Sequence, residues 1–264
     1  MAQQQITLLG CGKMGSAMLE GWLADTNLDA NFTVIEPHQT HLGWLKGQKT
    51  VRLYADCAAA IADDASFSTM IVLAVKPQMM DAAIAGAILL GVCEPQMTGI
   101  GGDCFVLFSP PGSDDIKAMN GSGCAPSAQS ATDMRSRGLN HVPEHSAEAV
   151  TVPGAIDAFC QLSNDWGKLG LEALLAPSIN YAENGVPVAP RVALDWAGLT
   201  SKLHVSAQKD YLIDGKAPLP GDMFSAPKQA KVLRRIAAKG RDGFYCGEVA
   251  DDMVQSLTAF GGAH

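Results

Sequence analysis

Three glycines near the amino terminus have the spacing of a turn that can approach a phosphate group. Gly10, Gly12 and Gly15 follow the apolar residues 6–9 and precede a helix-like pattern over residues 16–23. In a strand–turn–helix unit the first glycine permits the tight turn, the second lets the backbone approach a pyrophosphate, and the third allows close helix packing. Amide groups at the start of such a helix face the phosphates. The pattern predicts a dinucleotide-binding turn, with an ordinary strand-to-helix turn as the alternative.

An acidic residue stands at the distance that such a turn requires. Glu36 ends the apolar residues 32–35 and lies about 20 residues beyond the last glycine, where a carboxylate can accept hydrogen bonds from the adenosine ribose. A carboxylate there repels a 2′-phosphate and favours NAD, although His38 and Lys46 could compensate. NAD and NADP therefore both stay open, and a solvated strand end is the alternative for Glu36.

Short apolar segments must position these residues. Residues 51–54 and 70–75 are predicted as a third and a fourth strand, and the alanine-rich residues 58–62 as the helix between them. The nearly continuous apolar character of 70–75 is typical of a parallel strand that is buried on both faces. The first 80 residues are therefore predicted to form an α/β domain with a Rossmann-like parallel sheet.

The motifs Gly10-Cys11-Gly12-Lys13-Met14-Gly15, Glu36-Pro37 and Ala74-Val75-Lys76-Pro77-Gln78 resemble the amino-terminal domain of pyrroline-5-carboxylate reductase. In that family the Val-Lys-Pro segment lies beside the cofactor at the carboxyl end of the fourth strand; a simple strand end is the alternative. The resemblance implies NAD or NADP as cofactor and, as cofactor-binding residues, Gly10, Cys11, Gly12, Lys13, Met14, Gly15, Glu36, Ala74, Val75, Lys76 and Pro77. The family's later strands and helical substrate domain are not found after Met80, so no substrate pocket is expected.

The rest of the chain resembles a different family. The motifs are Glu94-Pro95, Gly99-Ile100-Gly101-Gly102, Asn120-Gly121-Ser122-Gly123-Cys124-Ala125-Pro126, Val152-Pro153-Gly154-Ala155 and Asp242-Gly243-Phe244-Tyr245. In this order they resemble the large subunit of the γ-glutamyltransferases, which are amino-terminal-nucleophile hydrolases with an αββα sandwich. The resemblance implies a composite chain, with a truncated Rossmann-like domain over 1–80 and an incomplete αββα fragment over 81–264.

The resemblance implies no catalytic residue in this second half. In the family a threonine at a newly cleaved amino terminus is the nucleophile, and it lies in a later segment than any present here. Thr98, Thr132, Thr151 and Thr200 do not occupy that motif. The arginine that holds the substrate carboxylate has no counterpart in register, and Cys124 stands where many relatives have a basic residue. Arg135 and Arg137 are only displaced candidates, because bidentate recognition depends on the placement of the guanidinium.

No metal site is expected. His141-Val142-Pro143-Glu144-His145 fits an inverted zinc-protease signature, but a proline inside the motif would break the helix that must carry both histidines. A loop before a strand over 149–152 is the better interpretation. The seven cysteines are scattered without zinc-like spacing, which suggests reduced thiols.

Composition excludes two classes of partner. A net charge of −8 argues against nucleic acid, whose binding depends on clustered basic residues. No apolar stretch approaches the roughly 20 residues that cross a bilayer, so no membrane is expected. The amino terminus lacks a basic signal-peptide region, and a cytoplasmic location follows as the default.

We therefore expect an NAD(P)-binding fragment fused, biologically or by a mis-joined reading frame, to a γ-glutamyltransferase-like fragment without complete catalysis. An active pyrroline-5-carboxylate reductase of proline biosynthesis is the first alternative, and a γ-glutamyl acyltransferase or glutathione hydrolase is the second.

The joint itself carries a structural expectation. Residues 79–90 are rich in Met, Ala, Ile and Leu and favour one continuous helix. Ala83, Ala87 and Leu90 are expected to pack against the second sheet. Both sheets should present unpaired edges, which predicts self-association.

Overall fold

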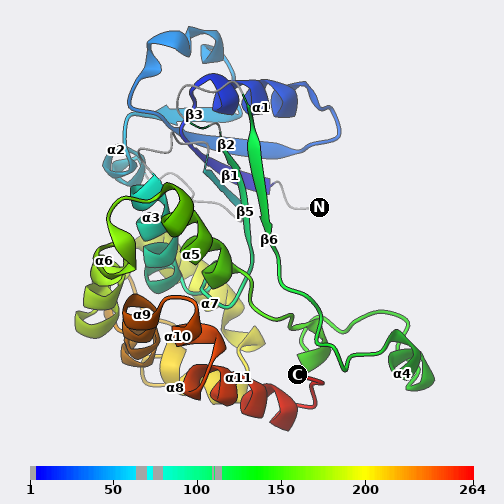
Figure 1. Cartoon of the computed structure of the whole chain (residues 1–264). Helices are drawn as coiled ribbons and strands as arrows, with labels where there is room; N and C mark the ends of the chain where they lie inside the picture. Colours follow the sequence, from blue (N-terminus) through cyan, green and yellow to red (C-terminus); the bar gives the residue numbers. More distant parts are fainter. Residues whose placement is uncertain (1–3, 64–69, 74–79, 109, 111–114) are drawn as a thin grey trace. The chain divides into compact units, whose positions relative to one another are not determined.

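The computed structural model describes residues 4–63, 70–73, 80–108, 110 and 115–264 (Figure 1). The chain divides into two units. The first comprises Met1–Ala83 and Phe105–Met119, and the second comprises Ile84–Cys104 and Asn120–His264.

A parallel sheet organises the first unit. Its strands, in the order β3-β2-β1-β4, are β1 (Gln4–Leu9), β2 (Ala30–Ile35), β3 (Val51–Tyr54) and β4 (Met70–Leu73). Ile6 lies opposite Phe32 and Leu8 opposite Val34, and all four side chains are buried. A strand between two parallel neighbours is expected to be buried on both faces, and the predicted sheet is confirmed. Residues 74 and 75, predicted to extend the fourth strand, lie outside the described residues.

The helices of this unit fix where the first turn lies. They are α1 (Lys13–Ala24) and α2 (Cys57–Ala62), with 3-10 turns η1 (Gln39–His41) and η2 (Gly43–Leu45). In α1, Leu19 is fully buried, and Trp22 stacks on Phe32 of β2 with ring centroids 5.8 Å apart. This apolar face holds α1 on the sheet, so that its first turn directly follows the carboxyl end of β1.

One helix crosses the division between the units. Helix α3 (Met80–Cys93) is continuous, as predicted for residues 80–90, and the division falls between Ala83 and Ile84. Its most buried side chains after that point are Ile84, Ile88 and Val92, whereas Ala87 and Leu90 are only half-buried. The predicted buried stripe is therefore wrong in part.

The larger apolar residues of α3, spaced four apart, occupy its buried side, as helical periodicity requires. Val92 packs with Ala182 of α6 (Gly170–Asn184) and Ala230 of α9 (Pro227–Lys239). Helices, and not a sheet, thus cover this end of α3.

Two further strands form a separate sheet. β5 (Cys104–Phe108) pairs with β6 (Lys117–Gly121). Along β5, Val106 and Phe108 are buried, while Phe105 is 66% exposed and Leu107 is exposed, the alternation expected of a strand. The predicted strand over 104–108 is confirmed. Self-association through sheet edges stays a prediction.

The second unit is mainly helical. Besides α6 and α9 it contains α4 (Ala131–Ser136), α5 (Ala155–Trp166), α7 (Pro190–Leu199), α8 (Val205–Tyr211), α10 (Asp242–Tyr245) and α11 (Glu248–Ala259), the 3-10 turns η4 (Ala147–Ala149) and η5 (Thr200–Lys202), and the short strands β7 (Val186–Pro187) and β8 (Met223–Phe224). Leu175 and Leu233 are fully buried. Trp196 meets Phe224 edge to face, with ring centroids 4.8 Å apart. These residues give the unit a core of its own.

The strand predicted over residues 149–152 is absent: η4 is followed by a loop. The Val152 N–H donates to the Cys124 carbonyl at 3.0 Å, but the amides of Gly154 and Ala155 both turn to the Gly102 carbonyl, at 3.1 and 2.9 Å. Pro153 has no N–H, so a ladder could not continue through it. The apolar pattern was therefore misread as a strand.

Glycines allow three backbone segments of the second unit to approach closely. A Cβ at Gly123 would lie 1.5 Å from the carbonyl oxygen of Val152, and one at Gly154 would lie 2.1 Å from that of Gly121. Asp103 Oδ1 accepts the Gly123 N–H at 2.9 Å. The crossing of these segments is therefore possible only without side chains.

Replacing Gly123 by alanine should destabilise the second unit by about 3 kcal/mol or more, because the backbone must move to admit the Cβ. Gly86→Ala in α3 is the matched control: its Cβ would meet nothing within 4 Å, and alanine in a helix interior stabilises by up to about 1 kcal/mol. Urea unfolding followed by circular dichroism measures both. Equal midpoints for the two variants would contradict the close approach.

Candidate functional site

The turn between β1 and α1 brings the predicted glycines to the end of the sheet. Gly10 has φ +88°, which only glycine adopts without strain, and its N–H donates to the Ile35 carbonyl at 2.8 Å. Gly12 precedes the helix with extended backbone, and no side chain caps the helix there. No acidic residue lies in the first turn. Among the described residues no side-chain cap therefore occupies the first amides of α1, which can act as donors.

The chain itself holds the Cys11 backbone in place. Its N–H donates to Glu36 Oε2 at 2.7 Å, and its carbonyl accepts from His41 Nε2 at 2.7 Å and from Ser16 Oγ at 3.0 Å. The other oxygen of Glu36 accepts the His38 N–H at 2.8 Å. Hydrogen bonds thus join the glycine loop, the end of β2 and the turn η1 in one network.

Glu36 is buried, with 8% of its surface exposed. Each carboxylate oxygen accepts one backbone N–H of the protein and keeps a further lone pair. Its predicted contact with a ribose hydroxyl stays a prediction, and the structure adds a second role: Glu36 tethers the glycine loop to β2.

The structure brings six of the predicted cofactor-binding residues together. They are Gly10, Cys11, Gly12, Lys13, Gly15 and Glu36. Ala74, Val75, Lys76 and Pro77 lie outside the described residues, as does the side chain of Met14. Sequence reasoning missed Ser16 and His41. Ser16 could have been identified from its hydroxyl group one turn into the helix. His41 could not, because its contact depends on how η1 folds back towards the glycine loop.

The loop residues fit an anionic diphosphate. A Cβ at Gly12 would meet nothing within 4 Å, so space is open in front of the helix. Unpaired amides at the positive end of a helix attract anions. The Cys11 thiol adds no negative charge, because burial, with Glu36 and Glu20 as lesser causes, raises its pKa above the ordinary 9.0 even though a bond to Ser16 opposes the shift. Cys11 therefore contributes its backbone.

In the second unit, three of the motif segments converge. The contacts among Gly102, Asp103, Gly121, Gly123 and Gly154 described above join residues 99–103, 120–126 and 152–155. The fourth segment joins them: the Tyr245 hydroxyl donates to the Pro153 carbonyl at 2.6 Å and accepts the Asp157 N–H at 3.1 Å. The motifs thus form one packed structure.

Glu94, in the Glu94-Pro95 motif, precedes the first of these segments. Its carbonyl accepts the Met97 N–H at 2.9 Å, which forms a turn. Burial, and to a lesser extent the carboxylate of Asp195, raises the pKa of Glu94. A carboxyl group in such surroundings is stabilised in its protonated form.

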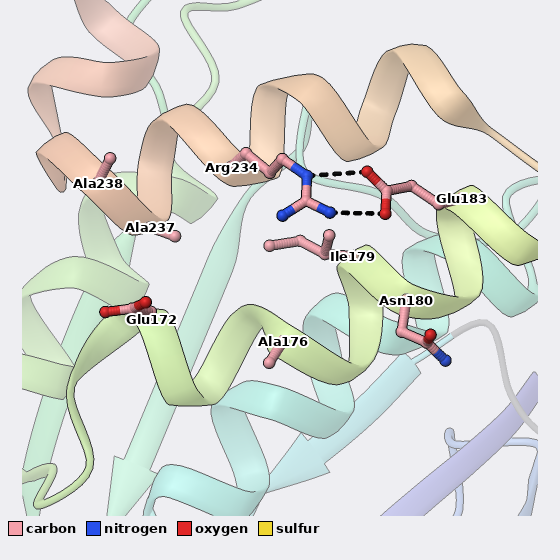
Figure 2. Close-up of a pocket in the computed structure, with 8 residues that line it drawn as sticks. All are labelled: Glu172, Ala176, Ile179, Asn180, Glu183, Arg234, Ala237 and Ala238. Atoms are coloured by element: carbon pink, nitrogen blue, oxygen red, sulfur yellow. Dashed lines mark hydrogen bonds and ion pairs between the residues drawn. The ribbon is translucent and has the colours of Figure 1, made fainter.

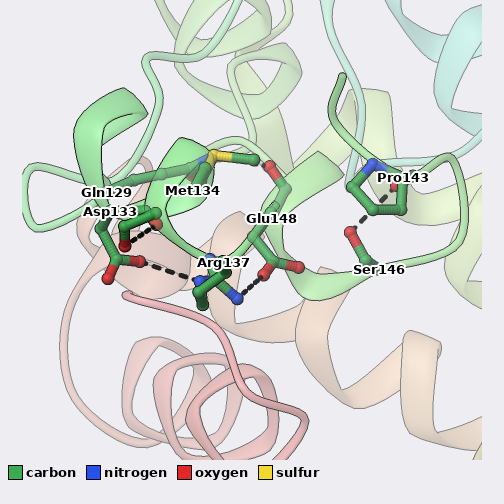
Figure 3. Close-up of polar contacts among 8 residues, drawn as sticks. Gln129, Asp133, Met134, Arg137, Pro143, Ser146 and Glu148 are labelled. Carbon is green, nitrogen blue, oxygen red and sulfur yellow. Dashed lines mark hydrogen bonds and ion pairs between the residues drawn. The ribbon is translucent and has the colours of Figure 1, made fainter. Parts of the chain in front are cut away.

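Arg137, a displaced candidate for the arginine that holds the substrate carboxylate, already binds two carboxylates of the protein. Its Nε binds Asp133 at 3.0 Å and its Nη1 binds Glu148 at 2.9 Å (Figure 3). The bond to Arg137 is the main cause that lowers the pKa of Glu148. With two carboxylates on its guanidinium, Arg137 is not free to hold a substrate carboxylate. Arg135 is exposed on α4, and no contact of it supports that role.

A hollow of about 440 Å³ lies between α6 and α9 of the second unit (Figure 2). Arg234 binds Glu183 in the two-pronged manner, at 2.8 and 2.6 Å, and this bond lowers the pKa of Glu183. Ala176, Ile179 and Ala237 supply the apolar part of its lining. Because the cation is neutralised by its neighbour, this hollow is not assigned a ligand.

Residues 141–145 form a loop, as predicted. Across the part of the chain that the structure describes, no group of three or more His, Cys, Asp or Glu side chains could hold a metal ion.

A family model described as gamma-glutamyltranspeptidase matches residues 68–264, well over half of the chain. The chain belongs to this family. A second model, described as NADP oxidoreductase, coenzyme F420-dependent, matches residues 5–90. In this member of the gamma-glutamyltranspeptidase family, the amino-terminal residues therefore form an oxidoreductase-like, Rossmann-type domain. The two matches overlap around α3, and the boundary at residue 80 stays a prediction.

Curated relatives agree with the gamma-glutamyltranspeptidase assignment. The chain is 36% identical over 184 residues to the glutathione hydrolase-like YwrD proenzyme of Bacillus subtilis, covering 67% of this chain and 34% of that protein. It is 35% identical over 205 residues to the oxamate amidohydrolase proenzyme of Klebsiella pneumoniae, covering 75% and 38%. The chain thus spans little more than a third of the length of these relatives.

Solved structures show the same fold. Cephalosporin acylase from Bacillus halodurans matches with a TM-score of 0.65 and 34% identity, over 70% of this chain and 36% of that one. Gamma-glutamyltranspeptidase from Helicobacter pylori matches with a TM-score of 0.64 and 27% identity, over 69% and 54%. The predicted combination of a Rossmann-like sheet with an amino-terminal-nucleophile hydrolase fold is confirmed. Among the described helices, none is both long and apolar enough to cross a membrane.

Thiol labelling should separate the cysteines by burial. Burial raises the pKa of Cys93, Cys104 and Cys160 to about 11 from the ordinary 9.0, so at pH 8 about one in a thousand is a thiolate. Cys124 and Cys246 are exposed. Iodoacetamide treatment at pH 8, followed by peptide mass spectrometry, should show these two labelled before Cys93, Cys104 and Cys160.

The same shifts give a pH dependence of stability. Because the folded-state pKa values lie above the unfolded ones, the stability that these thiols contribute is complete below about pH 9 and is lost as the pH rises through about 11. In the labelling experiment, rapid modification of Cys160 in the folded protein would contradict its burial.

Proposed function

We propose that the first unit binds NAD or NADP at the β1–α1 turn. The observation that carries the proposal is the glycine loop, whose Cys11 peptide is held by Glu36 and His41 while the space beside Gly12 is open. A bound nicotinamide dinucleotide would supply hydride transfer. Its pyrophosphate would lie on the amides of residues 12–15, and its adenosine ribose beside Glu36.

The similarity to NADP oxidoreductases supports this site, as does the resemblance of its motifs to pyrroline-5-carboxylate reductase. We place the dinucleotide domain over residues 1–80 and the transpeptidase-type domain over 81–264. Glu36 favours NAD over NADP, because a carboxylate near the 2′ position repels a phosphate.

The dinucleotide site can be tested with a single methyl group. Gly12→Ala should weaken NADH binding about tenfold or more, since the added Cβ occupies the space that the pyrophosphate must approach. Gly21→Ala in α1 is the matched control, because its Cβ also meets nothing within 4 Å and lies away from the loop. Titration with NADH and NADPH, followed by cofactor fluorescence, measures both variants. Absence of saturable binding by the unaltered protein would remove the proposal.

Catalysis as a pyrroline-5-carboxylate reductase is the first alternative. It would appear as NADH or NADPH oxidation that depends on added pyrroline-5-carboxylate. A rate equal to that without substrate would leave dinucleotide binding as the function of this unit.

A second candidate function belongs to the transpeptidase-type domain. The observation that favours it is the similarity of residues 68–264 to a family whose members here include a glutathione hydrolase-like proenzyme and an oxamate amidohydrolase proenzyme. Cleavage or transfer at an amide bond is the reaction class that these names share.

We expect no release of chromophore from a γ-glutamyl anilide by this chain alone. The reason is that Arg137 is neutralised and none of the four candidate threonines occupies the nucleophile's motif. A colorimetric assay measures this, with added glycylglycine to reveal transfer. Release above the rate with heat-denatured protein would establish the acyltransferase alternative.

A further inference from the structure

The carbonyl of Cys11 accepts two hydrogen bonds from side chains. His41 Nε2 lies 2.7 Å from this oxygen and Ser16 Oγ lies 3.0 Å from it. A carbonyl oxygen has two lone pairs and carries no hydrogen, so both partners must donate. His41 is therefore protonated at Nε2, whether its ring is neutral or charged.

This contact fixes the direction of the next amide. In a planar trans peptide the C=O and the following N–H point in opposite directions. With the Cys11 carbonyl held by His41 and Ser16, the Gly12 N–H must point away from both. Within the described part of the chain, no hydrogen bond uses the Gly12 N–H, and the space beside Gly12 is open.

Directly after the turn that carries His41, Leu42 is buried in the core of the first unit, whereas the side chain of His41 has no such packing role. Residues of η1 are not buried, and His41 itself is exposed. Its ring nevertheless returns to a residue 30 positions earlier in the chain. A rotated Cys11–Gly12 peptide would present a carbonyl oxygen, and not an N–H, to an approaching anion.

We infer that His41 is a positioning residue of the dinucleotide site: its ring holds the Cys11 carbonyl so that the Gly12 N–H stays aimed at the pyrophosphate. The ligand in this inference rests on the proposed function. The geometry of the loop rests only on the hydrogen bond between His41 and the Cys11 carbonyl. It assigns His41, five positions after Glu36, a role that the glycine motif does not contain.

Three variants test the role in binding. His41→Ala should weaken NADH binding about fivefold, the effect of one net hydrogen bond. His41→Gln should restore binding to within about twofold, because its amide can donate from nearly the position of Nε2. Thr40→Ala, an exposed neighbour in the same turn, should leave the affinity unchanged.

Two results of the titration would overturn the inference. One is an alanine variant that binds NADH as tightly as the unaltered protein. The other is a glutamine variant as weak as the alanine variant, which would show that the donor is not what matters.

A second measurement works without ligand. In ¹⁵N NMR spectra of the free protein, at a pH where the ring is neutral, His41 should carry its hydrogen on Nε2, and His41→Ala should speed exchange of the Cys11 amide. Protonation at Nδ1 would sink the inference whatever the titration shows. If the expected tautomer is found but the unaltered protein binds neither NADH nor NADPH, the proposed function fails while the loop geometry stands.

Discussion

A buried carboxylate bound to backbone amides is the interaction on which the amino-terminal site depends. Glu36 stands at the end of β2 and takes the N–H of Cys11 on one oxygen and that of His38 on the other. Burying a charge is unfavourable unless hydrogen bonds compensate it, and the two amides provide that compensation. In return the glycine loop and the turn after β2 are held at fixed positions. Because Glu36 accepts the Cys11 N–H, that amide does not compete with the first amides of α1 for an acceptor.

The second unit solves a related problem with glycine. Three segments from distant parts of the chain cross where only backbone atoms fit, and Gly123 and Gly154 occupy the tightest contacts. At Gly12 in the first unit a missing side chain leaves open space, whereas here it leaves room for another segment of the protein. The same residue type therefore keeps space open in one unit and permits close packing in the other.

Much of the fold could be predicted because its signals are local. The apolar strands, the glycine turn and the helix predicted over residues 79–90 follow from hydrophobic pattern and propensity over short windows. The failures depended mainly on non-local contacts. The supposed strand at 149–152 was decided by Pro153 and by the distant Gly102 carbonyl, and the buried side of α3 by its contacts with α6 and α9. Likewise Glu36 was found from its spacing, but His41 was not, since no periodicity links it to Cys11.

The continuity of α3 has a practical consequence for separating the two units. In an α-helix each N–H bonds to the carbonyl four residues earlier, so the hydrogen bonds around residues 83 and 84 join backbone from both sides of the division. A cut at that point would leave up to four amides and four carbonyls without partners at new helix ends. Either half, expressed alone, would therefore keep the backbone hydrogen bonds of α3 only if it carried the whole of residues 80–93.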